Sequence, residues 1–340
     1  MKKALFVLIA VALVTSLTLA QRRNRPNAPF ATGDALGKKT YHVSADGADR
    51  EFIVYRPIRL AANAKVPVVF VFHPTAANGA WAYQHMGWKE KADSEGFMVV
   101  FPTALKYHLF QDELVQKGEV VQNVTQYVTK WYHFRLPNLL DPKFPNQKLY
   151  DDVKFVQAIV ASVKQNYQVD TSRFYATGFS NGAQFTVRLV VQMSDVFAAF
   201  APCGAGAIEA ENMARTNEYT TAPFTPRPVS HLVGELDAKL THPLDIPAFP
   251  MDESLAAPDS ATKIYVITGF LTLLKLKDQY VYHRTPRISH FRYNQPLDAG
   301  APRVYDITIA KGMGHTYPNG KNYPLKAVDL FWPFMQKYKL

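Results

Sequence analysis

The sequence predicts an α/β protein with a mostly parallel central sheet and helices on both faces. Short apolar runs alternate along the chain with segments whose apolar residues recur at helical spacing, a rhythm typical of parallel α/β sheets. The run 66–72 is continuously apolar, as expected of a strand that is buried on both faces. Together these patterns favour a parallel sheet.

The individual elements follow from the same patterns. Asp151 is positioned to cap a helix that runs to about residue 167, because apolar side chains recur on one face of that segment. We expect two further helices, at 88–95 and 181–193. We expect strands at 51–55, 66–72, 97–101, 173–177, 197–201, 228–233 and 304–309.

Composition bounds the class of protein. The 340 residues are 48% hydrophobic and 19% charged, which excludes a disordered chain, a coiled coil and a collagen-like fibre. Cys203 is the single cysteine, so neither an intramolecular disulfide nor a cysteine-based zinc cluster can form. The fold must therefore be stabilised by its core.

The first twenty residues differ from the rest. Lys2 and Lys3 precede an apolar run from Ala4 to Val14, and small residues follow near Ala20. This layout predicts a secretory signal peptide over 1–20, and an uncleaved anchor is disfavoured because no stop-transfer pattern follows. We expect a polar leader over 21–37, a single α/β domain over 38–340, a secreted or periplasmic location in a bacterium, and no stable membrane insertion.

Two segments interrupt the alternation of strands and helices. Residues 105–150 are rich in aromatic side chains, and residues 238–300 combine proline-rich stretches with an apolar run from Ile264 to Leu276. We expect both to be loop insertions over the carboxyl ends of the strands, where α/β folds carry their functional groups.

Charge and motifs exclude several functions. Removal of Lys2 and Lys3 with the signal peptide lowers the formal net charge from +10 to +8, and the remaining excess is scattered. A nucleic-acid groove would need clustered basic residues, so we expect no nucleic-acid partner. Zinc, calcium, dinucleotide and P-loop motifs are missing from the sequence, so neither a metal nor a cofactor is implied.

The sharpest motif is Gly178-Phe179-Ser180-Asn181-Gly182, placed between a predicted strand and a predicted helix. Such a turn exposes the serine hydroxyl at the carboxyl edge of a sheet, with a helix N-terminus behind it. A glycine-rich turn with a capping serine is the structural alternative. The strand, turn and helix context favours a nucleophile.

A serine nucleophile needs a base and an orienting acid, in the chain order Ser, Asp or Glu, His. Asp237 and His315 each follow a predicted strand, so both are expected at the edge that carries Ser180. Glu235 and Asp245 remain rivals for the acid. Four other histidines follow Ser180 and are disfavoured because one lies within a strand and three follow no clear strand: His231, His242, His283 and His290.

Acyl transfer also needs donors for an oxyanion. The backbone N–H of Asn181 is one, and the loop after 66–72 should supply the other. Pro74 has no N–H, so Thr75 is the better second donor. We expect His73 to fix this loop rather than to act in catalysis.

These residues carry a family resemblance. The chain resembles the α/β-hydrolase esterases grouped with polyhydroxybutyrate depolymerases and feruloyl or acetylxylan esterases of the carbohydrate esterase family 1 type. The matching stretches occur in order over about residues 50–201 and thin out afterwards. Departures are Pro74, the long interval between Asp237 and His315, and the insertion at 105–150. The stretches are 66–74, 95–97 with 101–102, 150–156 with 178–182, and 312–318.

The resemblance implies a secreted serine esterase with a Ser180, Asp237 and His315 triad and no cofactor. Its ester substrate is expected to be a feruloyl or acetyl carbohydrate or a polyhydroxyalkanoate, and it can be polymeric. The aromatic residues of 107–134, including Trp131, should emerge beside the serine and favour short-chain and aromatic esters. Two alternatives remain: a secreted serine peptidase of the prolyl-oligopeptidase type and a non-catalytic polysaccharide-binding relative.

Overall fold

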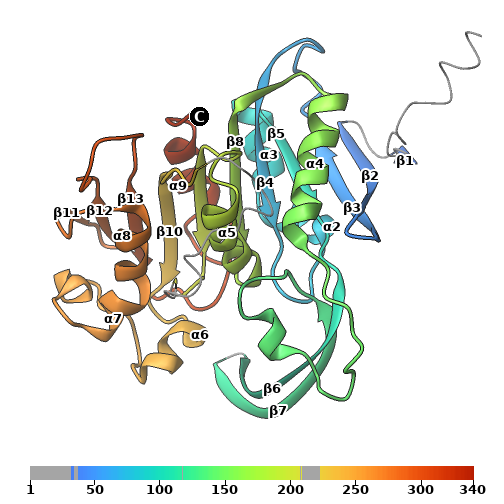
Figure 1. The fold of residues 1–340 in the computed structure, drawn as a ribbon. Helices are drawn as coiled ribbons and strands as arrows, with labels where there is room; N and C mark the ends of the chain where they lie inside the picture. The colour runs from blue at the N-terminus through green and yellow to red at the C-terminus, as the bar shows by residue number, and fades with distance from the viewer. Residues whose placement is uncertain (1–31, 34–36, 117, 207, 209–222) are drawn as a thin grey trace, which may run out of the picture.

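The described part of the chain is organised around one large β-sheet (Figure 1). The computed structural model describes residues 32–33, 37–116, 118–206, 208 and 223–340. The predicted signal peptide lies outside these residues, as does most of the predicted leader. Within the described ranges, no helix combines the length and apolar character needed to cross a bilayer.

The sheet is parallel at its centre and antiparallel at both edges. Its order is β1-β2-β3-β5-β4-β8-β9-β10-β13-β12-β11, and the neighbours from β5 to β13 are parallel. The strands are β1 Thr32–Gly33, β2 Lys38–Ala45, β3 Ala48–Tyr55, β4 Val66–Phe72, β5 Met98–Pro102, β8 Val169–Phe179, β9 Ala199–Cys203, β10 Val229–Gly234, β11 Tyr280–Arg284, β12 Ile288–Tyr293 and β13 Tyr305–Ala310.

Helices cover the two faces of this sheet. One face packs against α4 Asp152–Asn166, α5 Asn181–Gln192 and α8 Gly269–Leu274, which Figure 1 draws in front of the strands. The opposite face packs against α2 Gly79–His85, α3 Trp88–Glu95 and α9 Ala327–Met335. The predicted cap of α4 is present, because the Asp151 carboxylate accepts a hydrogen bond from the backbone N–H of Val153.

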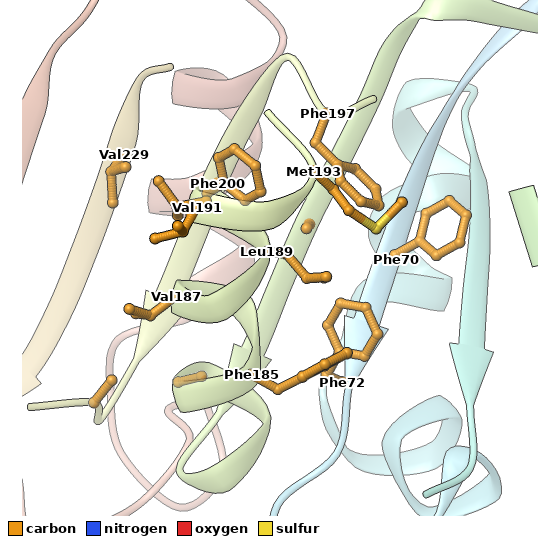
Figure 2. Close-up of a cluster of buried hydrophobic side chains, with 14 of the residues drawn as sticks. Phe70, Phe72, Phe185, Val187, Leu189, Val191, Met193, Phe197, Phe200 and Val229 are labelled. Atoms are coloured by element: carbon orange, nitrogen blue, oxygen red, sulfur yellow. The ribbon is translucent and has the colours of Figure 1, made fainter. Parts of the chain in front are cut away.

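The apolar face of α5 anchors the first of these layers. Figure 2 shows Phe185, Leu189 and Val191 of this helix packed toward the sheet, in the cluster that also contains Phe70, Phe72 and Phe200. The Phe72 and Phe185 rings pack edge to face with centroids 5.0 Å apart, a favoured aromatic geometry. Burial of these side chains fixes the start of α5 relative to the end of β4, and both ends lie at the candidate site.

The segment 105–150 forms a two-stranded sheet of its own. Strands β6 Lys106–Gln116 and β7 Glu119–Thr129 pair antiparallel and project beyond the main sheet near α6 Ala238–Thr241 (Figure 1). The segment then continues through the 3₁₀ turn η1 Leu136–Leu139 towards α4. The prediction of a loop insertion was wrong in that most of this segment is a paired hairpin. Both strands are mostly half-exposed or exposed and contain no continuous apolar run, so the strand signal in the sequence is weak.

The prediction for 238–300 was wrong in part. Strands β11 and β12 extend the main sheet beyond β13, so His283 and His290 lie in strands. In the structure, burial alternates along β12 as expected of a strand: Ser289, Phe291 and Tyr293 are buried, and the residues between them are half-exposed. The apolar run is helical: it begins with one π-helical turn, which continues directly into α8. The remaining elements are η3 His242–Leu244, η4 Glu253–Ala256, α7 Ala261–Lys263 and the π-turn η5 Ile264–Thr268.

Candidate active site

A sharp turn between β8 and α5 holds Ser180. Its backbone has φ 55° and ψ −119°, a region that side-chain-bearing residues rarely adopt. The Ser180 N–H donates to the Cys203 carbonyl at the end of β9, 2.9 Å away. This bond and the packing of α5 hold the strained turn in place.

The two glycines of the motif are required by close backbone contacts. A Cβ on Gly178 would lie 2.3 Å from the Gly182 carbonyl oxygen, and a Cβ on Gly182 would lie 2.2 Å from the Phe72 carbonyl oxygen. Both distances are far below van der Waals contact. The turn therefore forms only because positions 178 and 182 lack side chains.

Asp237 and His315 meet Ser180 at the same sheet edge. The loop after β13 carries His315, and its Nε2 lies 2.8 Å from Ser180 Oγ. On the other side of the ring, Nδ1 lies 2.9 and 2.8 Å from the two carboxylate oxygens of Asp237, which follows β10. A carboxylate accepts only, so the Nδ1–H donates to Asp237 and Nε2 accepts from the serine hydroxyl.

Neighbouring residues hold the side chains of Asp237 and His315 in position. Asp237 is 1% exposed, and its Oδ1 also accepts from the backbone N–H of Lys239 at the start of α6. The His315 ring packs on Phe179, with centroids 5.0 Å apart. Gly204 lies beneath the pair, since a Cβ there would be 3.5 Å from both Asp237 Oδ2 and His315 Cε1. The acid is thus fixed by its backbone partner as well as by the histidine.

The rival acids occupy other positions. Glu235 accepts from the backbone N–H of Gly312 at 2.6 Å, so it braces the loop that carries His315. Asp245 ends η3 in a left-handed conformation and is exposed. Neither carboxylate is bonded to His315 in the described structure.

The other histidines lie elsewhere as well. His231 is buried within β10 between Tyr305 and Ala205, and burial lowers its pKa to about 4. His290 lies 3.5 Å from Asp306 on β13. His242 contacts Glu113 of β6 and so joins η3 to the hairpin. None of these three is bonded to Ser180.

The loop after β4 lies against the serine turn. His73 is fully buried, accepts from the Ala104 N–H through Nε2 and contacts the Pro74 carbonyl through Nδ1. Burial lowers the pKa of His73 to about 4, so the ring is neutral at pH 7. This matches the loop-fixing role expected of it. Thr75 and Asn181 line the same cavity as Ser180.

That cavity has a volume of about 370 Å³ and opens above the serine. Its wall combines the main sheet edge, the hairpin and the 238–300 segment. The hydroxyl of Tyr265, on η5, lies against the backbone of Gly206. This contact is possible because Gly206 has no side chain, since a Cβ there would lie 2.6 Å from the hydroxyl oxygen. The lining includes Thr75, Glu113, Lys130, His133, Phe134, Arg135, Ser180, Asn181, Lys239, His242, Tyr265 and His315.

The chain from 130 to 135, here called the wall segment, is anchored through its backbone. The Asn181 side chain accepts from the Trp131 N–H at 2.7 Å, and Asp152 accepts from the Tyr132 N–H at 2.6 Å. Arg188 donates to the Tyr132 carbonyl at 2.5 Å. Sequence reasoning missed these anchors, because each joins residues 20 to 56 positions apart and no local pattern marks them.

Trp131 itself corrects an expectation. Its side chain is fully buried, donates to the His73 carbonyl at 2.9 Å and packs between Phe72 and Phe185. It does not line the cavity, so substitution of Trp131 tests folding rather than substrate choice. The aromatic groups at the cavity are instead Phe134 and Tyr265.

Comparison with solved structures identifies the fold class of the chain. No family model matches the chain. The solved structure of an S-formylglutathione hydrolase from Agrobacterium tumefaciens matches with a TM-score of 0.50 at 14% identity, over 91% of this chain and 99% of that one. At this identity the likeness concerns the fold, and the chain has the α/β-hydrolase fold.

Three curated relatives then narrow the resemblance. A bifunctional acetylxylan esterase/xylanase of Neocallimastix patriciarum is 27% identical over 58% of this chain and 22% of its own length. An oxidized polyvinyl alcohol hydrolase of Sphingopyxis sp. (strain 113P3) is 26% identical, over 64% and 57%. A poly(3-hydroxyalkanoate) depolymerase C of Paucimonas lemoignei is 27% identical, over 44% and 30%. The chain thus spans less than two thirds of each relative, and the predicted resemblance to esterases of this group is confirmed.

Proposed function

We propose that the protein is a serine carboxylic-ester hydrolase in which Ser180 is the nucleophile, His315 the base and Asp237 the orienting acid. One observation carries the proposal: the unbroken hydrogen-bonded chain from Ser180 Oγ through the His315 ring to the Asp237 carboxylate. A serine hydroxyl is a weak nucleophile at neutral pH, and a base bonded to it in this way activates it.

In the acylation step, Ser180 Oγ attacks the ester carbonyl carbon while its proton moves to His315 Nε2. The tetrahedral intermediate collapses as the carbon–oxygen bond to the alcohol breaks, and the alcohol leaves with the proton from His315. Asp237 stabilises the imidazolium and holds its tautomer. In deacylation, His315 takes a proton from the water that attacks the acyl carbon. The bond from that carbon to Ser180 Oγ then breaks, His315 returns the proton to Oγ, and the acid leaves. These steps use only protein groups and water.

The proposed oxyanion donors are the backbone N–H groups of Asn181 and Thr75. Asn181 begins α5, so its N–H is among the first amides of a helix, which have no partner within it. Thr75 follows Pro74 on a loop tied to the end of β7, where the Ala76 N–H donates to the Thr129 carbonyl at 3.0 Å. Each such donor contributes about 10²- to 10³-fold to the rate in comparable enzymes.

The proposed substrates are short-chain or aromatic esters, including feruloyl or acetyl groups on carbohydrates and polyhydroxyalkanoates. The names of the three relatives specify xylan, oxidized polyvinyl alcohol and poly(3-hydroxyalkanoate), which supports a polymeric substrate. Phe134 and Tyr265 supply flat aromatic faces in a cavity of moderate size. We also propose that residues 1–20 direct export, because Lys2 and Lys3 precede an apolar run that ends in small residues near Ala20.

The deciding experiment is Ser180→Ala in purified protein, assayed with p-nitrophenyl acetate and labelled with a fluorophosphonate probe. We expect kcat to fall by about 10³- to 10⁶-fold and labelling to vanish, with the circular dichroism spectrum unchanged. Ser94→Ala is the matched control, because Ser94 is exposed on α3, outside the cavity. Retained turnover in folded Ser180→Ala protein would refute the proposal.

A further inference from the structure

The cavity above Ser180 has an unusual charge balance. Three of its lining residues are cationic, Lys130, Arg135 and Lys239, and three more are histidines, His133, His242 and His315. Among the described lining residues Glu113 is the one carboxylate, and it is bonded to His242. A neutral acetyl or hydroxyacyl group gives no reason for this excess of positive groups.

Lys130 is the most buried of these cations. Its residue is 8% exposed, and its Nζ lies 3.5 Å from the hydroxyl of Thr75, a neutral acceptor. No carboxylate lies within ion-pair distance of it among the residues that the structure describes. Burial, and then the nearby Lys239, lowers the pKa of Lys130 to about 8. A buried ammonium without a counter-charge lowers stability, so an anion bound beside it offsets that cost.

His133 adds a second unsatisfied group to the same wall. It is 4% exposed, and its Nδ1 accepts from the Arg135 N–H at 3.3 Å, so the neutral ring carries its proton on Nε2. Burial, and then Lys130, lowers the pKa of His133 to about 3. In the described structure the Nε2 donor is buried and has no acceptor. A buried donor of this kind costs free energy until an acceptor reaches it, so it is available to a ligand atom in the cavity.

Lys239 lines the same cavity from another element. It lies on α6, two residues after Asp237, and is half-buried. Burial lowers the pKa of Lys239, and the Asp237 carboxylate opposes that effect. That carboxylate is already engaged by His315, so it is not a dedicated counter-ion for the lysine. Donors from the wall segment and from α6 therefore line one cavity.

We propose that the cavity contains an anion-binding subsite built by Lys130, His133 and Lys239, and that the preferred substrates are esters carrying a carboxylate near the scissile bond. The inference rests on the proposed esterase function and specifies its substrate class. A carboxylate offers four lone-pair sites, enough to satisfy an ammonium and a ring N–H together. It enters either on the acyl side, as in a monoester of a dicarboxylic acid, or on the alcohol side, as in a uronic acid or the free-acid end of a polyhydroxyalkanoate.

Two pairs of matched esters test the proposal and distinguish these sources. On the acyl side, p-nitrophenyl hydrogen glutarate is compared with its neutral amide, p-nitrophenyl 4-carbamoylbutanoate. On the alcohol side, 4-acetoxybenzoate is compared with 4-acetoxybenzamide. We expect kcat/KM of wild-type protein to favour the anionic ester of at least one pair by about 10-fold or more, as for a charge-assisted hydrogen bond. The same preference should weaken at high salt.

Substitutions of the two lysines test whether the preference for anionic esters comes from the subsite. Lys130→Met and Lys239→Met should each lower the anionic-to-neutral ratio of kcat/KM by about 10-fold, since each removes one charged donor. Comparison of ratios removes the intrinsic reactivity of each ester. Lys277→Met is the matched control: it removes the same charge from an exposed position outside the cavity and should leave the ratio unchanged.

One measurement needs no variant, which keeps the proposal testable if Lys130→Met fails to fold. Free glutarate should inhibit hydrolysis of p-nitrophenyl acetate by wild-type protein competitively and more strongly than neutral glutaramide. Equal inhibition, or equal kcat/KM within both ester pairs, would overturn the subsite while hydrolysis that depends on Ser180 stands. Absence of hydrolysis of every ester would instead refute the proposed function.

Discussion

The serine turn and the wall segment border the same cavity but are specified in different ways. The turn at 178–182 is fixed by contacts between neighbours in sequence and by the end of β4 beneath it. The wall segment is fixed by Asn181, Asp152 and Arg188, which are distant in sequence. Local geometry thus determines the shape of the serine turn, and long-range contacts determine what the cavity accepts.

The largest loss of activity is expected from a change at the proposed acid, Asp237, which acts on the serine turn and not on the wall segment. Asp237→Asn should preserve the position of the side chain but favour the wrong tautomer of His315, lowering kcat by up to about 10⁴-fold at neutral pH. Steady-state kinetics with p-nitrophenyl acetate measure the change. Glu235→Gln and Asp245→Asn serve as controls and should have far smaller effects. A crippling effect of either control, with Asp237→Asn active, would show that the wrong acid was chosen.

A second test concerns the backbone of the turn. Gly182→Ala places a methyl group against the Phe72 and His73 carbonyls, so it should lower the free energy of unfolding by about 3 kcal/mol or more. Urea unfolding measures this loss. Gly314→Ala is a suitable control for stability, because its Cβ would meet the Leu236 carbonyl at an ordinary 3.7 Å. Equal stability of the two variants would mean that the turn relaxes freely.

The wall segment can be tested by measuring how the stability of the protein changes as the pH is lowered. Burial lowers the pKa of His133 to about 3, and those of His73 and His231 to about 4, whereas an unfolded histidine titrates near 6.5. Below about pH 6.5 the unfolded chain binds more protons than the folded one, so stability falls as the pH falls. Each histidine contributes up to about 1.4 kcal/mol per pH unit to this fall.

His133→Gln removes one of these contributions. Between pH 4 and 6 its free energy of unfolding should fall less steeply than that of wild-type protein, by about one proton or 1.4 kcal/mol per pH unit. Urea unfolding across this range gives the slope, and His85→Gln at an exposed position should leave it unchanged. Identical slopes for wild type and His133→Gln would show that His133 is charged or solvated in the folded protein.

The sequence was sufficient where structure follows from neighbours. Strand 66–72, helix 88–95 and the cap at Asp151 are at the predicted positions. The candidate site also agrees, in that Ser180, Asp237 and His315 come together, because parallel strands deliver their carboxyl ends to one edge. Their catalytic roles remain a proposal.

The rest depended on pairing partners that sequence does not reveal. The β6–β7 hairpin and β11–β12 extension were missed, since their strands are half-exposed and lack a continuous apolar run. Trp131 was expected at the cavity, yet the bond from its indole to the His73 carbonyl holds it in the core. Aromatic content alone could not distinguish a wall from a core.

The way the wall segment is anchored has a consequence for evolution and for engineering. The fixed groups are the backbone of Trp131 and Tyr132 and the indole of Trp131, whereas the side chains at 130, 133 and 134 face the cavity. We therefore expect substitutions at 130 and 134 to change the chemistry of the cavity while these bonds hold the main chain and the serine turn in place. His133 differs, because its Nδ1 accepts from the Arg135 N–H within the segment. Single substitutions at positions 130 and 134 are thus a direct way to test new substrate ranges.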